Sequence, residues 1–191
     1  MEFEDVIYKR RTIRRFKQEL ISLETLKKLI DFARVAPMAS NIQGLEFIIV
    51  HNAEIREKIF PLIKFAGYLP ENQRTPEDGR RPTAYIIVLV NTKIKKSYFE
   101  YDVGAAVENI LLGAVYHGLG CCWMANINRR EIQKLCEIPE DFKITHVISL
   151  GYPDETPVME RYKNSFKYWK DDDDLMHIPK RALEDLIFKV F

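Results

Sequence analysis

The sequence predicts a single folded domain, residues 1–191, in which helices and strands both contribute to the core. Apolar residues recur at helical spacing in two segments, 23–33 and 102–118. Two runs rich in β-branched residues, 47–50 and 84–90, predict strands. With 191 residues, of which 47% are hydrophobic and 30% charged, the chain is long enough to bury a sizeable core.

The N-terminal half contains start and stop signals for its helices. Ser22 is suited to cap a helix that carries Leu26 and Leu29, and Pro37 ends this helix. The other elements expected in this half are a short amphipathic helix around residues 3–7, a strand at 47–50, a helix near 54–65 and a strand at 84–90.

The segment 66–82, which precedes the second strand, is polar and rich in turn-forming residues. Tyr68 lies among its glycines and prolines, which are Gly67, Pro70, Pro76, Gly79 and Pro82. This composition is typical of a surface excursion. We expect the segment to serve as a lid over a pocket.

The segment 102–118 predicts a helix that is apolar on all sides. Its main stripe includes Val103 and Ile110, while Gly104 and Leu112 make the opposite side small and apolar too. A second stripe predicts an amphipathic helix at the C-terminus; its members are Leu183, Leu186, Ile187, Val190 and Phe191. Because both helices need surfaces to pack against, we infer a homodimer. The alternative is that both stripes pack within one monomer.

Positive charge is concentrated near the N-terminus, although the formal net charge of the chain is only +1. Six of the nine residues from Lys9 to Lys17 are basic. Guanidinium groups match phosphate oxygens bidentately, and the Thr12 hydroxyl can donate to the same anion. The run therefore predicts a phosphate site. The alternatives are a solvated helix face, a localisation signal or a nucleic-acid-binding arm, and the near-neutral overall charge argues against nucleic acid.

Composition argues against several other classes of protein. No apolar run approaches the roughly 20 residues that span a bilayer, and the charged N-terminus lacks the apolar centre of a signal peptide. We therefore expect a soluble, cytoplasmic protein with no membrane partner. The three cysteines and four histidines show neither a disulfide framework nor a metal-ligand spacing, so we predict no metal.

Six short segments, in order along nearly the whole chain, match motifs of one protein family. They are 10–16 (RRTIRRF), 36–47 (APMASNIQGLEF), 102–114 (DVGAA and NILLGA), 118–123 (GLGCCW), 150–153 (LGYP) and 179–186 (PKRALEDL). Through these segments the chain resembles the flavin-dependent nitroreductase family. The resemblance implies an α+β fold, with a mainly antiparallel central sheet flanked by helices. It also implies a homodimer with FMN at the subunit interface.

The resemblance assigns roles within the arginine run. It places Arg10, Arg11 and Thr12 at the flavin phosphate and ribityl end, and Arg14 at the N1 and O2 edge of the isoalloxazine ring. Reduced flavin accumulates negative charge at that edge, so a cation there raises the reduction potential. Arg15 receives no role and is expected to face solvent.

The resemblance adds three further sets of cofactor-binding candidates. A polar loop after the second helix would contact the heteroatom edge of the ring, a segment after Trp123 would lie near flavin N5, and a basic residue near the C-terminus would close on the phosphate. These residues are Ser40, Asn41 and Gln43 in the loop, then Met124, Ala125 and Asn126, and finally Lys180 or Arg181. A helix-ending turn, a core strand and exposed charges are the respective alternatives. The sequence has Gly44 and Leu45 where the family often has Pro and Trp.

The implied activity is hydride transfer from NADH or NADPH, through flavin N5, to a flat electron-poor acceptor such as a nitroaromatic or a quinone, by a ping-pong mechanism. No acid or base side chain is expected to be essential, and Arg14 supplies electrostatic support. The sequence has no glycine-rich dinucleotide fingerprint, which agrees with transient nicotinamide binding. The alternatives are a flavin-fragmenting or reductively dehalogenating enzyme of the same superfamily, in which the 66–82 lid sets the choice, or a non-enzymatic FMN-binding sensor.

Overall fold

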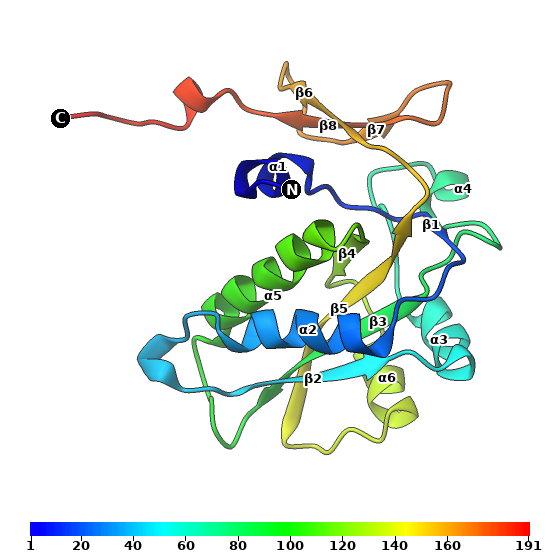
Figure 1. Cartoon of the computed structure of the whole chain (residues 1–191), viewed down its shortest axis with the longest axis vertical. Helices are drawn as coiled ribbons and strands as arrows, with labels where there is room; N and C mark the ends of the chain where they lie inside the picture. The colour runs from blue at the N-terminus through cyan, green and yellow to red at the C-terminus, as the bar shows by residue number, and fades with distance from the viewer.

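An antiparallel sheet lies at the centre of the computed structural model, which describes residues 1–191 (Figure 1). The strand order is β1-β5-β3-β2, and β4 also pairs with β5. The strands are β1 (Phe16–Lys17), β2 (Leu45–Val50), β3 (Ala84–Asn91), β4 (Gly120–Met124) and β5 (Phe142–Pro153). Helices flank this sheet, so the predicted α+β fold is confirmed.

Strand β3 separates two halves of the core. Its residues alternate between the faces of the sheet, and all of them from Ala84 to Val90 are buried. Ile86 packs in the cluster formed with α2 (Leu23–Arg34) and α5 (Phe99–Tyr116), whereas Ile87 packs in the cluster formed with α3 (Ala53–Ile59) and α6 (Arg129–Leu135). Because helices cover both faces, the strand is continuously apolar.

The first two helices form where the sequence predicts them. Helix α1 spans Phe3–Lys9, and α2 begins after Ser22, whose side-chain oxygen accepts a hydrogen bond from the Thr25 N–H at 3.0 Å. Helix α2 ends at Arg34, three residues before Pro37. No helix of the chain has both the length and the apolar character needed to cross a membrane.

The third helix is shorter than predicted. Helix α3 ends at Ile59, and the single 3-10 turn η2 (Phe60–Leu62) follows it. Pro61 has no backbone N–H to continue the α-helical hydrogen bonds, which accounts for the early end. In the segment 66–82, Ala66 and Leu69 still pack in the core, and most of the rest is a surface excursion that contains one short helix, α4 (Glu71–Arg74).

Helix α5 is less buried than its sequence predicts. Val103 and Ile110 face the core and are buried, as expected. On the other side, Gly104 and Leu112 are only half-buried, and Tyr116 is exposed. The expectation of a helix buried on all sides is therefore wrong for one chain, because α1 and α2 cover the second side only in part.

The C-terminal part of the chain forms a second, smaller sheet. Strands β6 (Val158–Arg161) and β8 (Met176–Lys180) pair in parallel, and β7 (Trp169–Lys170) pairs antiparallel with β8. This sheet lies beside α1, at the top of Figure 1. It therefore brings residues 158–180 close to the arginine run that follows α1.

The predicted C-terminal amphipathic helix is wrong. After β8 the chain forms one 3-10 turn, η3 (Leu183–Asp185), and then extends away from the body of the molecule (Figure 1). The apolar side chains at its end are bare, since Phe188 and Phe191 have relative exposures of 102% and 105%. So short a helix is not stable without a surface beneath its apolar stripe, and one chain supplies none.

Two glycines let residues 12–16 lie close against β4 and β5. A Cβ atom at Gly120 would lie 2.7 Å from Cβ of Ile13. A Cβ atom at Gly151 would lie 2.7 Å from the ring of Phe16, which is itself fully buried. Neither position accepts a larger residue without moving the arginine run.

We expect Gly151→Ala to lower the free energy of unfolding by about 1–3 kcal/mol, because the buried Phe16 ring must shift to admit a methyl group. Urea unfolding monitored by circular dichroism measures this change. Gly67→Ala is the matched control, since a Cβ at Gly67 meets nothing within 4 Å. An equal loss in both variants would contradict the packing explanation.

Candidate functional site

The arginine run is held in an extended path along β4. The Ile13 N–H donates to the Cys121 carbonyl at 2.9 Å, and Thr12 forms a parallel bridge with the same residue. Arg14 and Arg15 follow and are both buried. A basic run of this kind is usually solvated, so the burial of two adjacent guanidinium groups marks an unusual site.

Arg10 and Arg11 have different electrostatic surroundings. Arg10 faces Glu108 of α5 at 3.6 Å. The Arg11 guanidinium contacts only uncharged acceptors, namely the Arg10 carbonyl at 2.5 Å and the Met159 sulfur at 3.4 Å. Partial burial, followed by the neighbouring charge of Arg10, lowers the pKa of Arg11. A half-buried cation with no carboxylate partner is suited to bind an anion.

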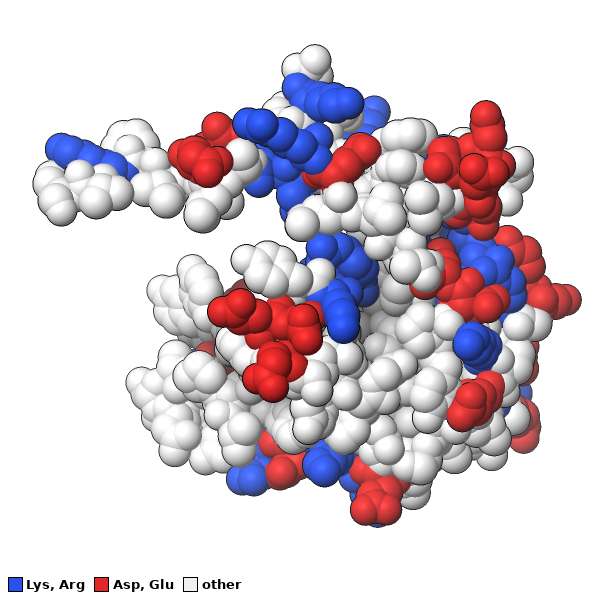
Figure 2. Space-filling model, turned by 45° about the horizontal axis from the view of Figure 1, so that its top comes forward, with Lys and Arg blue, Asp and Glu red and all other residues white.

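The two C-terminal candidates lie on the same side of the molecule. Strand β6 carries Met159, which contacts Arg11, and pairs with β8 so that Arg161 lies opposite Lys180. Arg181 follows directly and donates to the Asp185 carbonyl. Figure 2 shows basic side chains on both sides of the gap between the C-terminal extension and the body of the molecule.

Arg14 is buried beneath the small C-terminal sheet. It is 8% exposed, and its guanidinium carbon lies 4.7 Å from the centre of the Tyr168 ring. The Nε atom is buried and has no hydrogen-bond partner, and no carboxylate forms an ion pair with the side chain. Arg14 therefore keeps an uncompensated positive charge.

Arg15 does not face solvent, so that expectation is wrong. Its side chain is 2% exposed and binds Glu77 of the 66–82 segment through two nitrogens, each 2.9 Å from a carboxylate oxygen. Burial acts to lower the pKa of Arg15, but the hydrogen bond and charge of Glu77, with the charge of Glu155, outweigh it and raise the pKa. The neutralised Arg15 ties the predicted lid to the arginine run.

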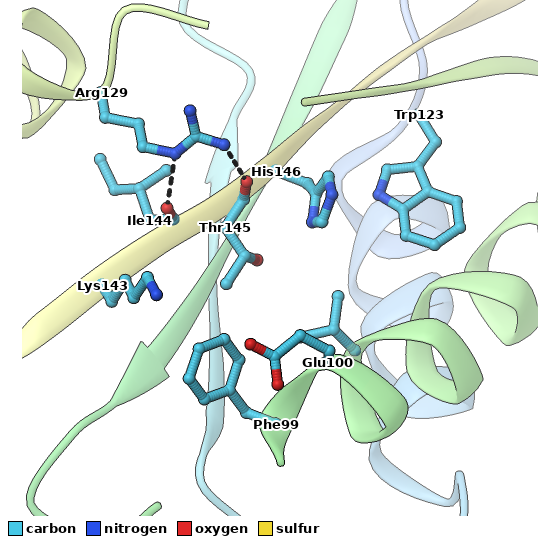
Figure 3. Close-up of a pocket in the computed structure, with 9 residues that line it drawn as sticks. Phe99, Glu100, Trp123, Arg129, Lys143, Ile144, Thr145 and His146 are labelled. Carbon is cyan, nitrogen blue, oxygen red and sulfur yellow. Dashed lines mark hydrogen bonds between the residues drawn. The ribbon is translucent and has the colours of Figure 1, made fainter. Parts of the chain in front are cut away.

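The segment after β4 is also fixed by an arginine. Arg129 donates to the carbonyls of Ala125, Ile144 and Thr145 at 3.1, 3.0 and 2.8 Å, and the last two bonds are drawn in Figure 3. Met124 is buried, whereas Ala125 and Asn126 are exposed. Two of the three residues predicted to approach flavin N5 thus lie at the surface, on a backbone that Arg129 holds in place.

A cavity of about 440 Å³ opens beside this segment (Figure 3). Trp123 and His146 form one wall, with their rings edge to face and their centres 5.0 Å apart, and Phe99 lies on the opposite side. Burial, followed by the charge of Arg129, lowers the pKa of His146, whose Nδ1 has no partner. His146 is therefore uncharged at neutral pH.

The Ser40, Asn41 and Gln43 loop lies apart from the arginine run in the same chain (Figure 1). Its anchor is Asp102, which accepts the Ala39 N–H at 3.0 Å and pairs with the buried Lys95 at 2.9 Å. Ser40 and Asn41 both have positive φ, 56° and 53°, and both are exposed. Strained polar residues held by a buried ion pair are typical of a binding loop. One chain does not bring them to the other candidates.

Sequence reasoning missed three residues that organise this region. They are Glu155, Tyr168 and Arg129. The Glu155 carboxylate is buried and accepts the N–H groups of Arg14 and Arg15 at 2.5 and 3.3 Å. Glu155 lies two residues after the 150–153 motif, which could have drawn attention to it. The other two stand in segments without a recognisable pattern.

The arrangement fits a ligand with a phosphate at one end. Arg11 offers a guanidinium without a carboxylate partner beside β6 and β8. Arg14 offers a second, buried guanidinium three residues farther along the run. FMN has this combination of an anionic end and a ring edge that becomes negative on reduction. The residues present therefore fit FMN.

Comparison with protein families gives one extended match. The sequence model described as the Nitroreductase family matches residues 7–152. A candidate NADH dehydrogenase/NAD(P)H nitroreductase of Archaeoglobus fulgidus is 34% identical over 155 residues, which cover 78% of this chain and 83% of that protein. An iodotyrosine deiodinase of Thermotoga neapolitana is 27% identical over 164 residues, which cover 79% of this chain and 88% of that protein.

Solved structures share the fold over almost the whole chain. An FMN-dependent nitroreductase from Clostridium difficile R20291 superposes with a TM-score of 0.66 at 23% sequence identity, and covers 98% of this chain and 99% of its own. At that identity the likeness concerns the fold. It extends through the small C-terminal sheet as well as the central one.

The Arg15–Glu77 pair predicts an acid-sensitive contribution to stability. Because the hydrogen bond from Arg15 lowers the pKa of Glu77, this contribution is present above the unfolded-state pKa of about 4.3 and is lost as the pH falls through the lower folded-state pKa. We expect Glu77→Gln to cost about 1–2 kcal/mol at pH 7, less than a fully buried pair because Glu77 is 54% exposed. The difference should shrink as the pH falls below the unfolded-state value and through the lower folded-state pKa of Glu77.

Urea unfolding of both proteins across this pH range measures the effect. Glu54→Gln is the matched control, since Glu54 pairs with Lys58 on an exposed helix surface. A wild-type advantage over Glu77→Gln that does not shrink on acidification would contradict the assignment.

Proposed function

This chain belongs to the nitroreductase family, whose members are oxidoreductases, and we propose that it is an FMN-dependent enzyme that passes reducing equivalents from NADH or NADPH to a flat, electron-poor acceptor. The observation that carries this proposal is the pair of unneutralised cations, Arg11 and Arg14, on one extended segment. Each neighbouring arginine, Arg10 and Arg15, has a carboxylate partner. The family resemblance places Arg11 at the phosphate, together with Arg10, and Arg14 at the ring.

The residues divide the work of holding the cofactor. Arg11, with Lys180 or Arg181 from the end of β8, binds the phosphate, and Arg10 and Thr12 support this end. Arg14 stabilises negative charge at the N1 and O2 edge of the ring, which favours the reduced form. When bound, FMN supplies N5 as the position that accepts and returns the hydride.

The remaining surfaces orient the reactants and exclude water. The exposed backbone at Ala125 and Asn126 faces N5 in this proposal, and Arg129 fixes its position. The 66–82 segment, which Arg15 holds through Glu77, acts as a lid over the cofactor site of the single domain 1–191. Turnover is ping-pong, because donor and acceptor use the same open ring face in succession.

We propose that the site is completed by a second copy of the chain. Ser40, Asn41 and Gln43 lie apart from the arginine run within one chain, and the second side of α5 is only partly covered. A homodimer places the loop of one protomer at the arginine run of its partner. It also supplies a surface for the bare residues after η3.

A reductive dehalogenase is the second candidate. The Thermotoga neapolitana iodotyrosine deiodinase matches 79% of this chain, and such an enzyme would use the same cofactor site with a different acceptor. Its distinguishing property would be halide release from an iodinated phenol. A flavin-fragmenting enzyme or an FMN-binding sensor would instead be recognised by the lack of rapid turnover with NADH or NADPH, which neither requires.

We expect the purified protein to bind FMN and to lose the visible absorbance of the oxidised flavin on anaerobic addition of NADH or NADPH. Arg11→Ala should raise the FMN dissociation constant about tenfold or more, because a charge-assisted contact with the phosphate contributes at least about 1.5 kcal/mol. Fluorescence titration with FMN measures this constant.

Arg34→Ala is the control, because Arg34 forms an exposed ion pair with Asp31 on α2. Riboflavin, which lacks the phosphate, should bind wild type and Arg11→Ala equally well. A protein that binds FMN but is not reduced by either nucleotide would favour the sensor, and equal losses in the two arginine variants would contradict the phosphate assignment.

We expect the protein to be a dimer by light scattering, and removal of residues 183–191 to weaken the dimer and FMN binding together. The physical reason is that the deleted segment contributes apolar surface that one chain leaves uncovered. Lys189→Ala is the control for a change in this segment that leaves its apolar residues intact. A wild-type monomer that binds FMN at full affinity would contradict the shared site.

A further inference from the structure

Tyr168 stands at the point where three distant segments meet. Its ring faces the Arg14 guanidinium at 4.7 Å, and it lies just before β7 in the small C-terminal sheet. Its hydroxyl oxygen accepts the Tyr68 N–H at 3.4 Å, and the two tyrosine rings pack edge to face with centres 5.3 Å apart. The arginine run, the 66–82 lid and the C-terminal sheet are thus joined through one side chain.

The support that Arg14 receives differs in kind from that of Arg15. Arg15 is neutralised by Glu77 at 2.9 Å and faces Glu155 at 3.9 Å. Arg14 is nearly as buried, but the face of an aromatic ring holds its guanidinium, and Glu155 contacts only its backbone N–H. A π face attracts a cation without carrying a formal negative charge.

This difference has an electrostatic consequence. A carboxylate beside Arg14 would fix the guanidinium equally well, but it would cancel the charge that the site offers to a ligand. The Tyr168 ring restricts the long, flexible side chain and leaves that charge intact. The buried, unpartnered Nε of Arg14 shows that part of its binding capacity is still free.

We propose that Tyr168 is a positioning residue that aims the uncompensated charge of Arg14 at the flavin, and so sets the reduction potential of the bound cofactor. This inference rests on the proposed function. It assigns to the C-terminal sheet a role in the redox chemistry, beyond its contact with the phosphate end. Through Tyr68, it also links the position of the lid to the position of the charge.

The test is the midpoint potential of bound FMN, measured anaerobically against a reference dye, with the FMN dissociation constant measured separately. Tyr168→Leu removes the π face and should change the ratio of reduced to oxidised flavin about tenfold toward the oxidised form at a fixed potential, a shift of about 30 mV for a two-electron couple. Tyr168→Phe keeps the π face and should retain the wild-type potential.

Tyr162→Leu is the matched control. Tyr162 lies in the same part of the chain and is similarly half-buried, but its ring stacks on Phe166, with centres 4.4 Å apart, and contacts no arginine. It should leave the potential unchanged. If Tyr168→Leu does not fold by circular dichroism, Tyr168→Met replaces it, since Met also fills the space without a π face.

A double-mutant cycle separates action through Arg14 from a general structural effect. If Tyr168 acts through Arg14, Tyr168→Leu should shift the potential of wild type but add nothing in an Arg14→Ala background. An unchanged potential in Tyr168→Leu, or a shift that adds in full to that of Arg14→Ala, would overturn the inference. Failure of wild type to bind FMN, or to be reduced by NADH or NADPH, would instead overturn the proposed function.

Discussion

The burial of two adjacent guanidinium groups is the constraint on which this structure depends. Removing an ion from water costs several kcal/mol even after relaxation, so both side chains need favourable contacts within the fold. Glu155 holds the backbone of both residues, because its carboxylate accepts both N–H groups, and its charge faces the Arg15 side chain. The local path is in turn possible because Gly120 and Gly151 leave room for Ile13 and Phe16.

Two adjacent arginines that look alike in the sequence have different roles in the structure. Arg14 and Arg15 are neighbours of the same type, and both are buried. One is neutralised and anchors the 66–82 segment, whereas the other retains its charge against an aromatic ring. If FMN binds as we propose, the reduction potential depends on the arginine that keeps its charge, whereas stability depends on the neutralised one, so one short segment would serve both the cofactor and the fold.

Local patterns predicted the elements that local physics determines. The Ser22 cap, the apolar stripe of α2 and the continuous run of β3 each carry their signal within a few residues, and each appears in the structure. The C-terminal stripe was misleading because a helix of that length depends on a distant surface, and one chain provides none. Arg15 was misassigned for a similar reason, since its partner Glu77 lies 62 residues away. Tyr168 had no pattern at all, and only the fold shows its contact with Arg14.

The extended segment after η3 ties the energetics of folding to the amount of protein present. In the homodimer that we propose, its exposed aromatic rings are buried against the second chain, so part of the free energy that maintains the native state would be intermolecular. Such a protein withstands heat or urea better in concentrated than in dilute solution. On the same proposal, newly synthesised chains expose this apolar segment until they pair, and aggregation is then most favoured in the interval before pairing.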